Sequence, residues 1–207
     1  QVYYGEDSHS FISSSFITIF CGALLSLSNI EKEYKLNLQQ TFLFTSMAWF
    51  MIALFGSIPF MLSPISLSFS DAFFESMSGI TTTGSTTITN LDSSPKSILL
   101  WRSIMQWLGG IGIVVMAITV LPLLKVGGMQ LFKMEGPDST EKILPRTVEV
   151  ASTIILIYLL LTFLCGFFYW IFGMTIFDSV SHAMTTIATG GFSTHNDSIG
   201  FFKNSNI

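Results

Sequence analysis

Long apolar runs alternate with polar stretches and with two shorter, partly apolar segments along this chain. Four of the runs are long enough to cross a bilayer as helices, for which about 20 apolar residues are needed. The predicted spans are residues 11–27, 41–62, 97–124 and 148–174.

Two shorter segments, residues 70–87 and 175–194, follow the second and fourth spans. In the first, Ser70 can cap a short helix whose early turns carry Asp71 and Glu75, where acidic groups suit the positive end of the helix dipole. A helix of about ten residues rises only about 15 Å, which is half a membrane. Because such a helix cannot cross, each segment is predicted to be a re-entrant helix followed by a loop.

The two short segments are copies of one another. A gapless shift of 107 residues aligns an acidic start, an apolar turn and a Thr-x-Gly end. Non-helical backbone at bilayer depth is tolerated only where it is buried in protein or lines a water-filled cavity, so two such loops predict a pore. The identical aligned pairs are Asp71 with Asp178, Met77 with Met184, Ile80 with Ile187, Thr82 with Thr189, Gly84 with Gly191 and Thr87 with Thr194.

The composition is that of an integral membrane protein. Half of the residues are hydrophobic and 11% are charged, against about 25% charged in typical soluble domains. The net charge is -4 and no basic patch is present, which excludes nucleic acid as a partner. Cys21 and Cys165 lie inside apolar runs, which predicts reduced structural thiols. The sequence offers no nucleophile with a base, phosphate loop or ligand cluster, so we predict no enzyme, metal site or cofactor.

The two loops have the chemistry to bind a monovalent cation through backbone. Carbonyl oxygens can replace the hydration shell of an ion in a narrow constriction without holding it too tightly. The β-branched residues before Gly84 favour extended backbone with free carbonyl oxygens, and glycine can adopt positive φ and admit a close neighbour. The C-terminal end of each short helix would add partial negative charge. The predicted filter residues are Thr81, Thr82, Thr83, Gly84, Ser85, Ala188, Thr189, Gly190, Gly191 and Phe192.

Four further residues are candidates for supporting the loops. Arg102 lies near the end of a span, where it could brace a loop through hydrogen bonds or snorkel to the interface. Glu75 could attract cations or form hydrogen bonds within the protein. Gly109 and Gly110 could hinge their helix, admit loop backbone or allow close helix packing. Outside this set, Asp92 is predicted to be a solvated loop charge.

The basic residues predict an orientation for the chain. The polar connectors at residues 28–40 and 125–146 hold six of the nine Lys and Arg residues. The positive-inside rule then makes the connectors cytoplasmic and places both re-entrant loops on the external side.

Three motifs together resemble the Trk/Ktr/HKT superfamily of potassium transporters, closest to its bacterial TrkH type. They are TTTGST at residues 81–86, WRSIMQWLGGIGI at 101–113 and ATGGFSTHN at 188–196, and the resemblance covers nearly the whole chain. It implies an all-α, K⁺ channel-like membrane fold of four repeats, each made of a helix, a re-entrant pore helix with its filter loop, and a helix. It also identifies Gly84 and Gly191 as the first two filter glycines, and glycine at the first implies K⁺ conduction.

The resemblance divides the chain into two repeats and their flanks. Residues 1–40 would be the end of an extra N-terminal hairpin and a connector, 41–124 the first pore repeat, 125–146 a cytoplasmic connector, and 147–207 an incomplete second repeat. The third and fourth filters would then lie outside the sequence. The chain starts with Gln1 and shows no signal peptide, so we predict that it is part of a longer protein.

The resemblance also implies the biological setting. It predicts a multi-pass subunit in the lipid bilayer of the cell inner (cytoplasmic) membrane that takes up K⁺ as a homodimer. A cytoplasmic nucleotide-binding regulatory subunit would meet it at residues 125–146, and K⁺ would be the transported ion rather than a cofactor. Two alternatives stay open, a Na⁺-conducting relative and a non-conducting membrane scaffold that keeps the repeat for packing alone.

Overall fold

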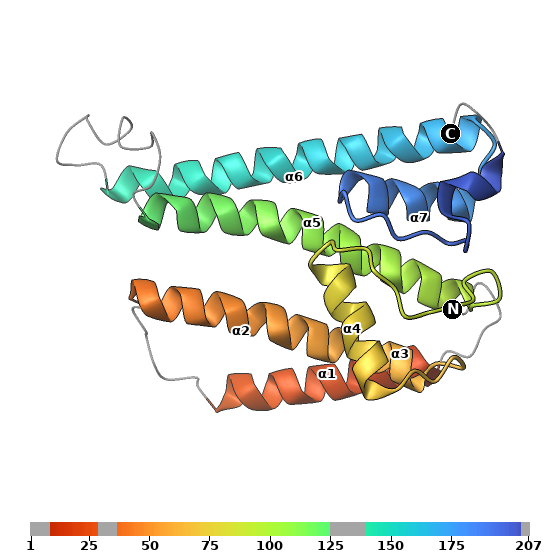
Figure 1. Ribbon diagram of the computed structural model, residues 1–207. Helices are drawn as coiled ribbons and strands as arrows, with labels where there is room; N and C mark the ends of the chain where they lie inside the picture. Colours follow the sequence, from red (N-terminus) through yellow and green to blue (C-terminus); the bar gives the residue numbers. More distant parts are fainter. Residues whose placement is uncertain (1–8, 29–36, 125–139, 204–207) are drawn as a thin grey trace.

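The computed structural model describes residues 9–28, 37–124 and 140–203, and this part of the chain is helical with no strand (Figure 1). The all-α prediction is therefore confirmed. The elements are α1 (His9–Leu27), α2 (Leu38–Gly56), α3 (Ile58–Leu62), α4 (Phe69–Ile80), α5 (Lys96–Leu124), α6 (Thr140–Ile171), α7 (Ile176–Ile187) and the 3-10 helix η3 (Ser198–Phe202).

Within the described residues, four helical segments are long and apolar enough to cross a membrane, and they coincide with the four predicted spans. They are His9–Leu27, Gln39–Leu62, Lys96–Met116 and Glu149–Ile171. In the last of these segments, no residue of the most apolar stretch is buried inside the protein. Such exposure is expected for a helix surface that faces lipid. The protein is a multi-pass membrane protein.

The second span contains a break near its end. Helix α2 ends at Gly56, and α3 starts at Ile58 with Pro59 in its first turn, where a missing N–H group costs little. The side chain of Trp101 in α5 donates a hydrogen bond from Nε1 to the Gly56 carbonyl oxygen at 3.0 Å. The break therefore exposes a carbonyl group that α5 satisfies.

The two short helices lie on either side of α5. Helix α4 packs between α2 and α5, and α7 packs against α5 and α6 (Figure 1). Buried apolar residues gather where α4 meets its neighbours, with Ala53, Ile80 and Met105 in one cluster and Phe60 and Ile98 in another. Helix α5 is thus the common support of both short helices.

The cap of α4 differs from the prediction. The Ser68 hydroxyl accepts a hydrogen bond from the Asp71 N–H group at 3.2 Å and donates one to the Asp71 carboxylate at 2.7 Å. The prediction that Ser70 caps the helix was wrong, because a capping oxygen must precede the helix to reach an N–H group of its first turn. Thr175 makes the same pair of contacts with Asp178 at the start of α7, at 3.1 Å and 2.6 Å.

Removing the cap of α4 is expected to lower stability modestly. Ser68→Ala leaves an N–H group of the first turn without its side-chain acceptor, so the free energy of unfolding should fall by about 1 kcal/mol. Thermal unfolding of the purified protein in detergent measures this. Ser46→Ala is the matched control, because the Ser46 hydroxyl donates to the Phe42 carbonyl within its own helix α2. Equal melting temperatures for the two variants would contradict a stabilising cap.

The predicted connectors lie largely outside the described residues. Residues 29–36 and 125–139 are not described, and they carry most of the basic residues that predict the orientation. The predicted contact with a regulatory subunit lies mostly there as well.

Candidate functional site

Both short helices end in the same backbone turn. The N–H groups of Thr82 and Thr83 donate to the carbonyl oxygens of Gly79 and Ser78, both at 2.9 Å, and α7 closes with bonds of the same pattern and length. This is a Schellman motif, in which the residue after the cap adopts left-handed backbone and is usually glycine. Thr82 and its equivalent Thr189 both adopt it, with φ of 56°. The prediction of extended backbone was wrong at Thr81, which caps the helix with φ of -85° and ψ of 3°. It was also wrong at Thr82, because the helix end requires a left-handed residue there.

This left-handed backbone is strained at both threonines. A β-branched residue at positive φ is an outlier that persists only where the surrounding structure enforces it, and such residues cluster at functional sites. The two strained residues are 107 residues apart, so the backbone conformation repeats with the same spacing as the sequence. The two turns are therefore equivalent features of the two repeats.

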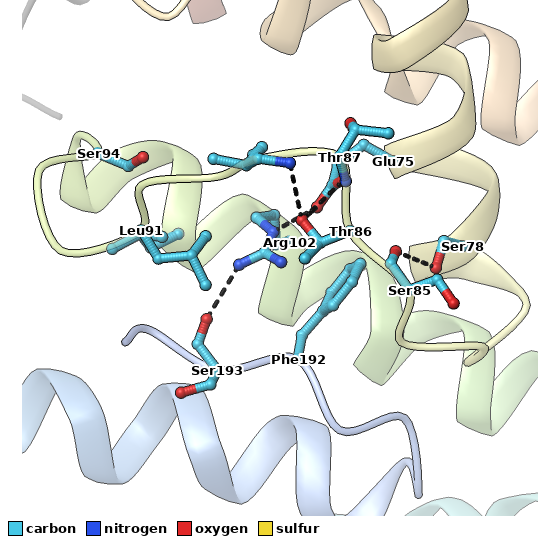
Figure 2. A network of polar contacts seen from close by, with 12 residues as sticks. Glu75, Ser78, Ser85, Thr86, Thr87, Leu91, Ser94, Arg102, Phe192 and Ser193 are labelled. Carbon is cyan, nitrogen blue, oxygen red and sulfur yellow. Dashed lines mark hydrogen bonds and ion pairs between the residues drawn. The ribbon is translucent and has the colours of Figure 1, made fainter. Parts of the chain in front are cut away.

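The residues after each short helix form two glycine loops, residues 81–85 (the first glycine loop) and 188–192 (the second). Gly84 and Gly191 have φ of 80° and 79°, so the predicted positive φ at Gly84 is confirmed. No described residue donates a hydrogen bond to the carbonyl oxygens of residues 81–84 or 188–191. All carbonyl oxygens of the first loop were predicted to be free, but the Ser85 carbonyl oxygen is not. It accepts a hydrogen bond from the Ser78 hydroxyl at 2.6 Å (Figure 2).

A buried ion pair connects α5 to α4 and to both loop ends. Arg102 Nε donates to Glu75 Oε1 at 2.6 Å, and the two side chains are 1% and 0% exposed. Glu75 also accepts from the Thr86 hydroxyl and the Thr87 N–H group, each at 2.9 Å. Arg102 Nη1 donates to the Ser193 carbonyl oxygen at 2.9 Å, directly after the second loop (Figure 2). Glu75 thus takes the hydrogen-bonded role, and Arg102 braces the loops instead of snorkelling.

The second repeat keeps this support position with different chemistry. His182 is the equivalent of Glu75, and its Nε2 lies 3.0 Å from the hydroxyl of Ser193, the equivalent of Thr86. The hydroxyls of Thr86 and Ser193 each accept an N–H group two residues further on, both at 3.1 Å. The chain that leaves each loop is therefore tied to its own short helix.

One face of α5 contacts the second glycine loop. Arg102, Gln106 and Gly110 are four residues apart, so they share a face of the helix. The Arg102 guanidinium carbon lies 4.1 Å from the centre of the Phe192 ring. Gln106 Oε1 accepts the Phe192 N–H group at 3.1 Å. A Cβ at Gly110 would lie 3.0 Å from Ala188.

A neighbouring face of α5 contacts the first repeat. A Cβ at Gly109 would overlap the Ile80 carbonyl oxygen, at the point where α4 ends. Met105 packs against Gly79 and Gly56 on the same side. Of the predicted roles for Gly109 and Gly110, the structure shows close backbone approach without a hinge, because α5 continues through both residues.

A second link between the repeats lies beyond the loops. Asp92 Oδ1 lies 2.6 Å from His195 Nδ1, and the Leu91 N–H group donates to Asn196 Oδ1 at 2.8 Å. The hydrogen bond from His195 holds the pKa of Asp92 below its ordinary value. The prediction that Asp92 is a solvated loop charge is confirmed, since its side chain is 43% exposed. What the prediction missed is that the carboxylate also links the two repeats through His195.

Gln106 is the contact residue that sequence reasoning missed. Its side chain is fully buried, and its partner Phe192 is 86 residues away in the sequence. An amide inside an apolar span, one turn after Arg102, was the available signal. Within the described ranges, no group of three or more His, Cys, Asp or Glu side chains could hold a metal ion.

Residues 7–207 match the TrkH family, which is described as a cation transport protein. The chain belongs to this family. The Trk system potassium uptake protein TrkH of Vibrio parahaemolyticus is 44% identical over 93% of this chain and 40% of its own length. TrkH of Escherichia coli K12 is 43% identical over 100% of this chain and 43% of its own length. The resemblance inferred from three motifs is confirmed.

A solved structure of a TrkH-family member has the same fold. The crystal structure of the potassium transporter TrkH from Vibrio parahaemolyticus matches with a TM-score of 0.83 and 41% identity, over 96% of this chain and 40% of that chain. This TrkH-family chain thus spans about two fifths of the length of these relatives.

Proposed function

We propose that the two glycine loops form two walls of a K⁺ selectivity filter in the pore-forming subunit of a potassium uptake system. The observation that carries this proposal is the pair of matched backbone turns, each with a positive-φ glycine. Their carbonyl oxygens at residues 81–84 and 188–191 accept no hydrogen bond from the described residues. A dehydrated monovalent cation needs such oxygens as ligands.

The short helices add a favourable electrostatic field at the loops. Helices α4 and α7 have 12 residues each and therefore rise about 18 Å. Each ends at a glycine loop, where the helix dipole places about half a negative elementary charge. Asp71 and Asp178 lie in the first turns, where they balance the positive ends. This arrangement favours a cation at the loops without a charged side chain as a ligand.

The names of the relatives support potassium as the ion. They are potassium uptake proteins of Trk systems, and the matched crystal structure is that of a potassium transporter. In the whole protein, four such loops would surround one pore in the cytoplasmic membrane. A homodimer with a nucleotide-binding regulatory subunit follows from the family resemblance, with K⁺ as the transported ion and no cofactor.

The proposal is tested by serine substitutions at the two glycines. Gly84→Ser is expected to abolish K⁺ uptake, because a side chain at positive φ is strained by about 1–3 kcal/mol and its Cβ would overlap the Gly190 carbonyl oxygen. Gly191→Ser carries the strain without an overlap, so its loss should be smaller. Radioactive rubidium uptake measures this in bacteria that lack their own K⁺ uptake and express the full-length protein.

The matched control is Gly22→Ser, since an added Cβ in α1 meets nothing within 4 Å. Protein levels in the membrane are measured for every variant. Unchanged uptake and unchanged K⁺ over Na⁺ preference in Gly84→Ser would favour the non-conducting scaffold. Uptake by the unmodified protein that prefers Na⁺ would favour the Na⁺-conducting relative.

A further inference from the structure

The Gln106 side chain has one amide atom that its known contact does not use. Gln106 is 0% exposed, and its Oε1 accepts the N–H group of Phe192. Its Nε2 is buried and has no hydrogen-bond partner among the described residues. A buried donor without a partner is unfavourable, and most buried side-chain donors in proteins are paired. The hydrogen bond to Phe192 alone therefore does not account for an amide at this position.

Gln106 lies directly behind the point where the two glycine loops meet. A Cβ at Gly190 would overlap the Gln106 amide group, and a Cβ at Gly84 would overlap the Gly190 carbonyl oxygen. That same Cβ at Gly84 would lie 3.7 Å from Gln106 Nε2. One amide thus borders a residue of each loop, with its acceptor bonded to the second loop and its donor next to the first.

The sequences of the two loops differ where this amide lies. The shift of 107 residues that aligns the loops places Gly190 on Thr83. In the second loop a side chain at this position has no room, because the Gln106 amide occupies the space. The presence of Gln106 therefore explains why the second loop has glycine where the first loop has Thr83.

We propose that Gln106 is a positioning residue for ion selection, which sets the separation and register of the two loops. The inference rests on the proposed filter function. Gln106 Oε1 holds the second loop by accepting the Phe192 N–H group. The atoms of the same amide group limit how closely Gly190 can approach α5. K⁺ and Na⁺ differ in radius by a fraction of an ångström, so the placement of carbonyl oxygens determines which ion replaces its hydration shell well.

Two substitutions separate positioning from packing. Gln106→Met fills similar space without a donor or acceptor, and it should lower the K⁺ over Na⁺ preference about fivefold, as expected for one lost buried hydrogen bond. Gln106→Glu keeps an acceptor for the Phe192 N–H group, and burial favours the neutral carboxyl form, which has a similar shape. Its preference should therefore fall between wild type and Gln106→Met. Ser103→Ala is the control, because the buried Ser103 hydroxyl donates to the Leu99 carbonyl within its own helix α5.

A double-variant cycle tests the same contact from the loop side. Gly190→Ala should displace the amide and lower the preference, whereas Gly190→Ala combined with Gln106→Ala should be less impaired than the sum of the two single changes. If Gln106→Met fails to reach the membrane, this cycle still tests the contact between Gln106 and Gly190.

The readout is competitive uptake of K⁺ and Na⁺ by cells that express the full-length protein, with protein level measured separately. A preference in Gln106→Met equal to that of wild type, or equal losses of K⁺ and Na⁺ uptake, would overturn the proposal. An unmodified protein without K⁺-selective uptake would instead reject the filter function on which the proposal rests.

Discussion

Arg102→Met is expected to remove most of the folded protein from the membrane, and K⁺ uptake with it. The substitution leaves the Glu75 carboxylate fully buried without its cationic partner. Breaking a buried ion pair in this way costs about 3–5 kcal/mol, a large part of the 5–15 kcal/mol that typically stabilises a folded protein. The hydrogen bond from Arg102 to the Ser193 carbonyl is lost as well, so the second repeat also loses a support.

The unpaired charge should dominate this loss. Adding Glu75→Gln to Arg102→Met removes the second charge, and the double variant should be more stable than Arg102→Met alone. The new amide oxygen can still accept from the Thr87 N–H group. Fluorescence-detected size-exclusion chromatography of solubilised membranes, followed by thermal unfolding, measures both the amount of folded protein and its stability.

Lys96→Met is the matched control for charge removal from α5. Lys96 is exposed, and its ammonium group lies 5.6 Å from the centre of the Phe177 ring. The loss of this exposed cation–π contact contributes about 0.5–1 kcal/mol, which is well below the cost of breaking a buried ion pair. If Arg102→Met were no less stable than Lys96→Met, the ion pair would not be the link that holds the two repeats together.

The second large effect is expected for Gly109→Ala. The added methyl group would overlap the Ile80 carbonyl oxygen, and both the helix and the end of α4 are backbone that cannot rotate away. Overpacking costs about 1–3 kcal/mol and forces a backbone shift. Because the first glycine loop starts directly after Ile80, this shift should also lower the K⁺ over Na⁺ preference.

Two other glycines calibrate this result. Gly22→Ala adds a methyl group to open space on α1 and should raise stability by about 0.5–1 kcal/mol, which is the difference in helix propensity. Gly112→Ala should have an intermediate effect, since its Cβ would lie 3.3 Å from the ring of Trp49, a side chain that can adjust. Thermal unfolding and competitive ion uptake would contradict the expectation if Gly109→Ala behaved like Gly22→Ala.

The largest features were predictable because each depends on a local property of the chain. The length of each span follows from the length of an apolar run. The positive φ of Gly84 was predictable because glycine has no Cβ and adopts this backbone conformation without strain. The errors at Ser70 and Thr82 arose at helix ends, where hydrogen bonds of the terminal turns determine the cap and the left-handed residue. Composition and propensity do not show which of several neighbouring Ser or Thr residues takes such a position.

The sequence by itself determined the four spans, the two short helices and the repeat that relates them, because these depend on hydrophobic length and on residues close together in the chain. Only the tertiary structure decided what supports the loops. Gln106 meets Phe192 across 86 residues, and Asp92 meets His195 across 103. Such pairs form only when α5 packs between α4 and α7, so neither partner carries a local signal of the other.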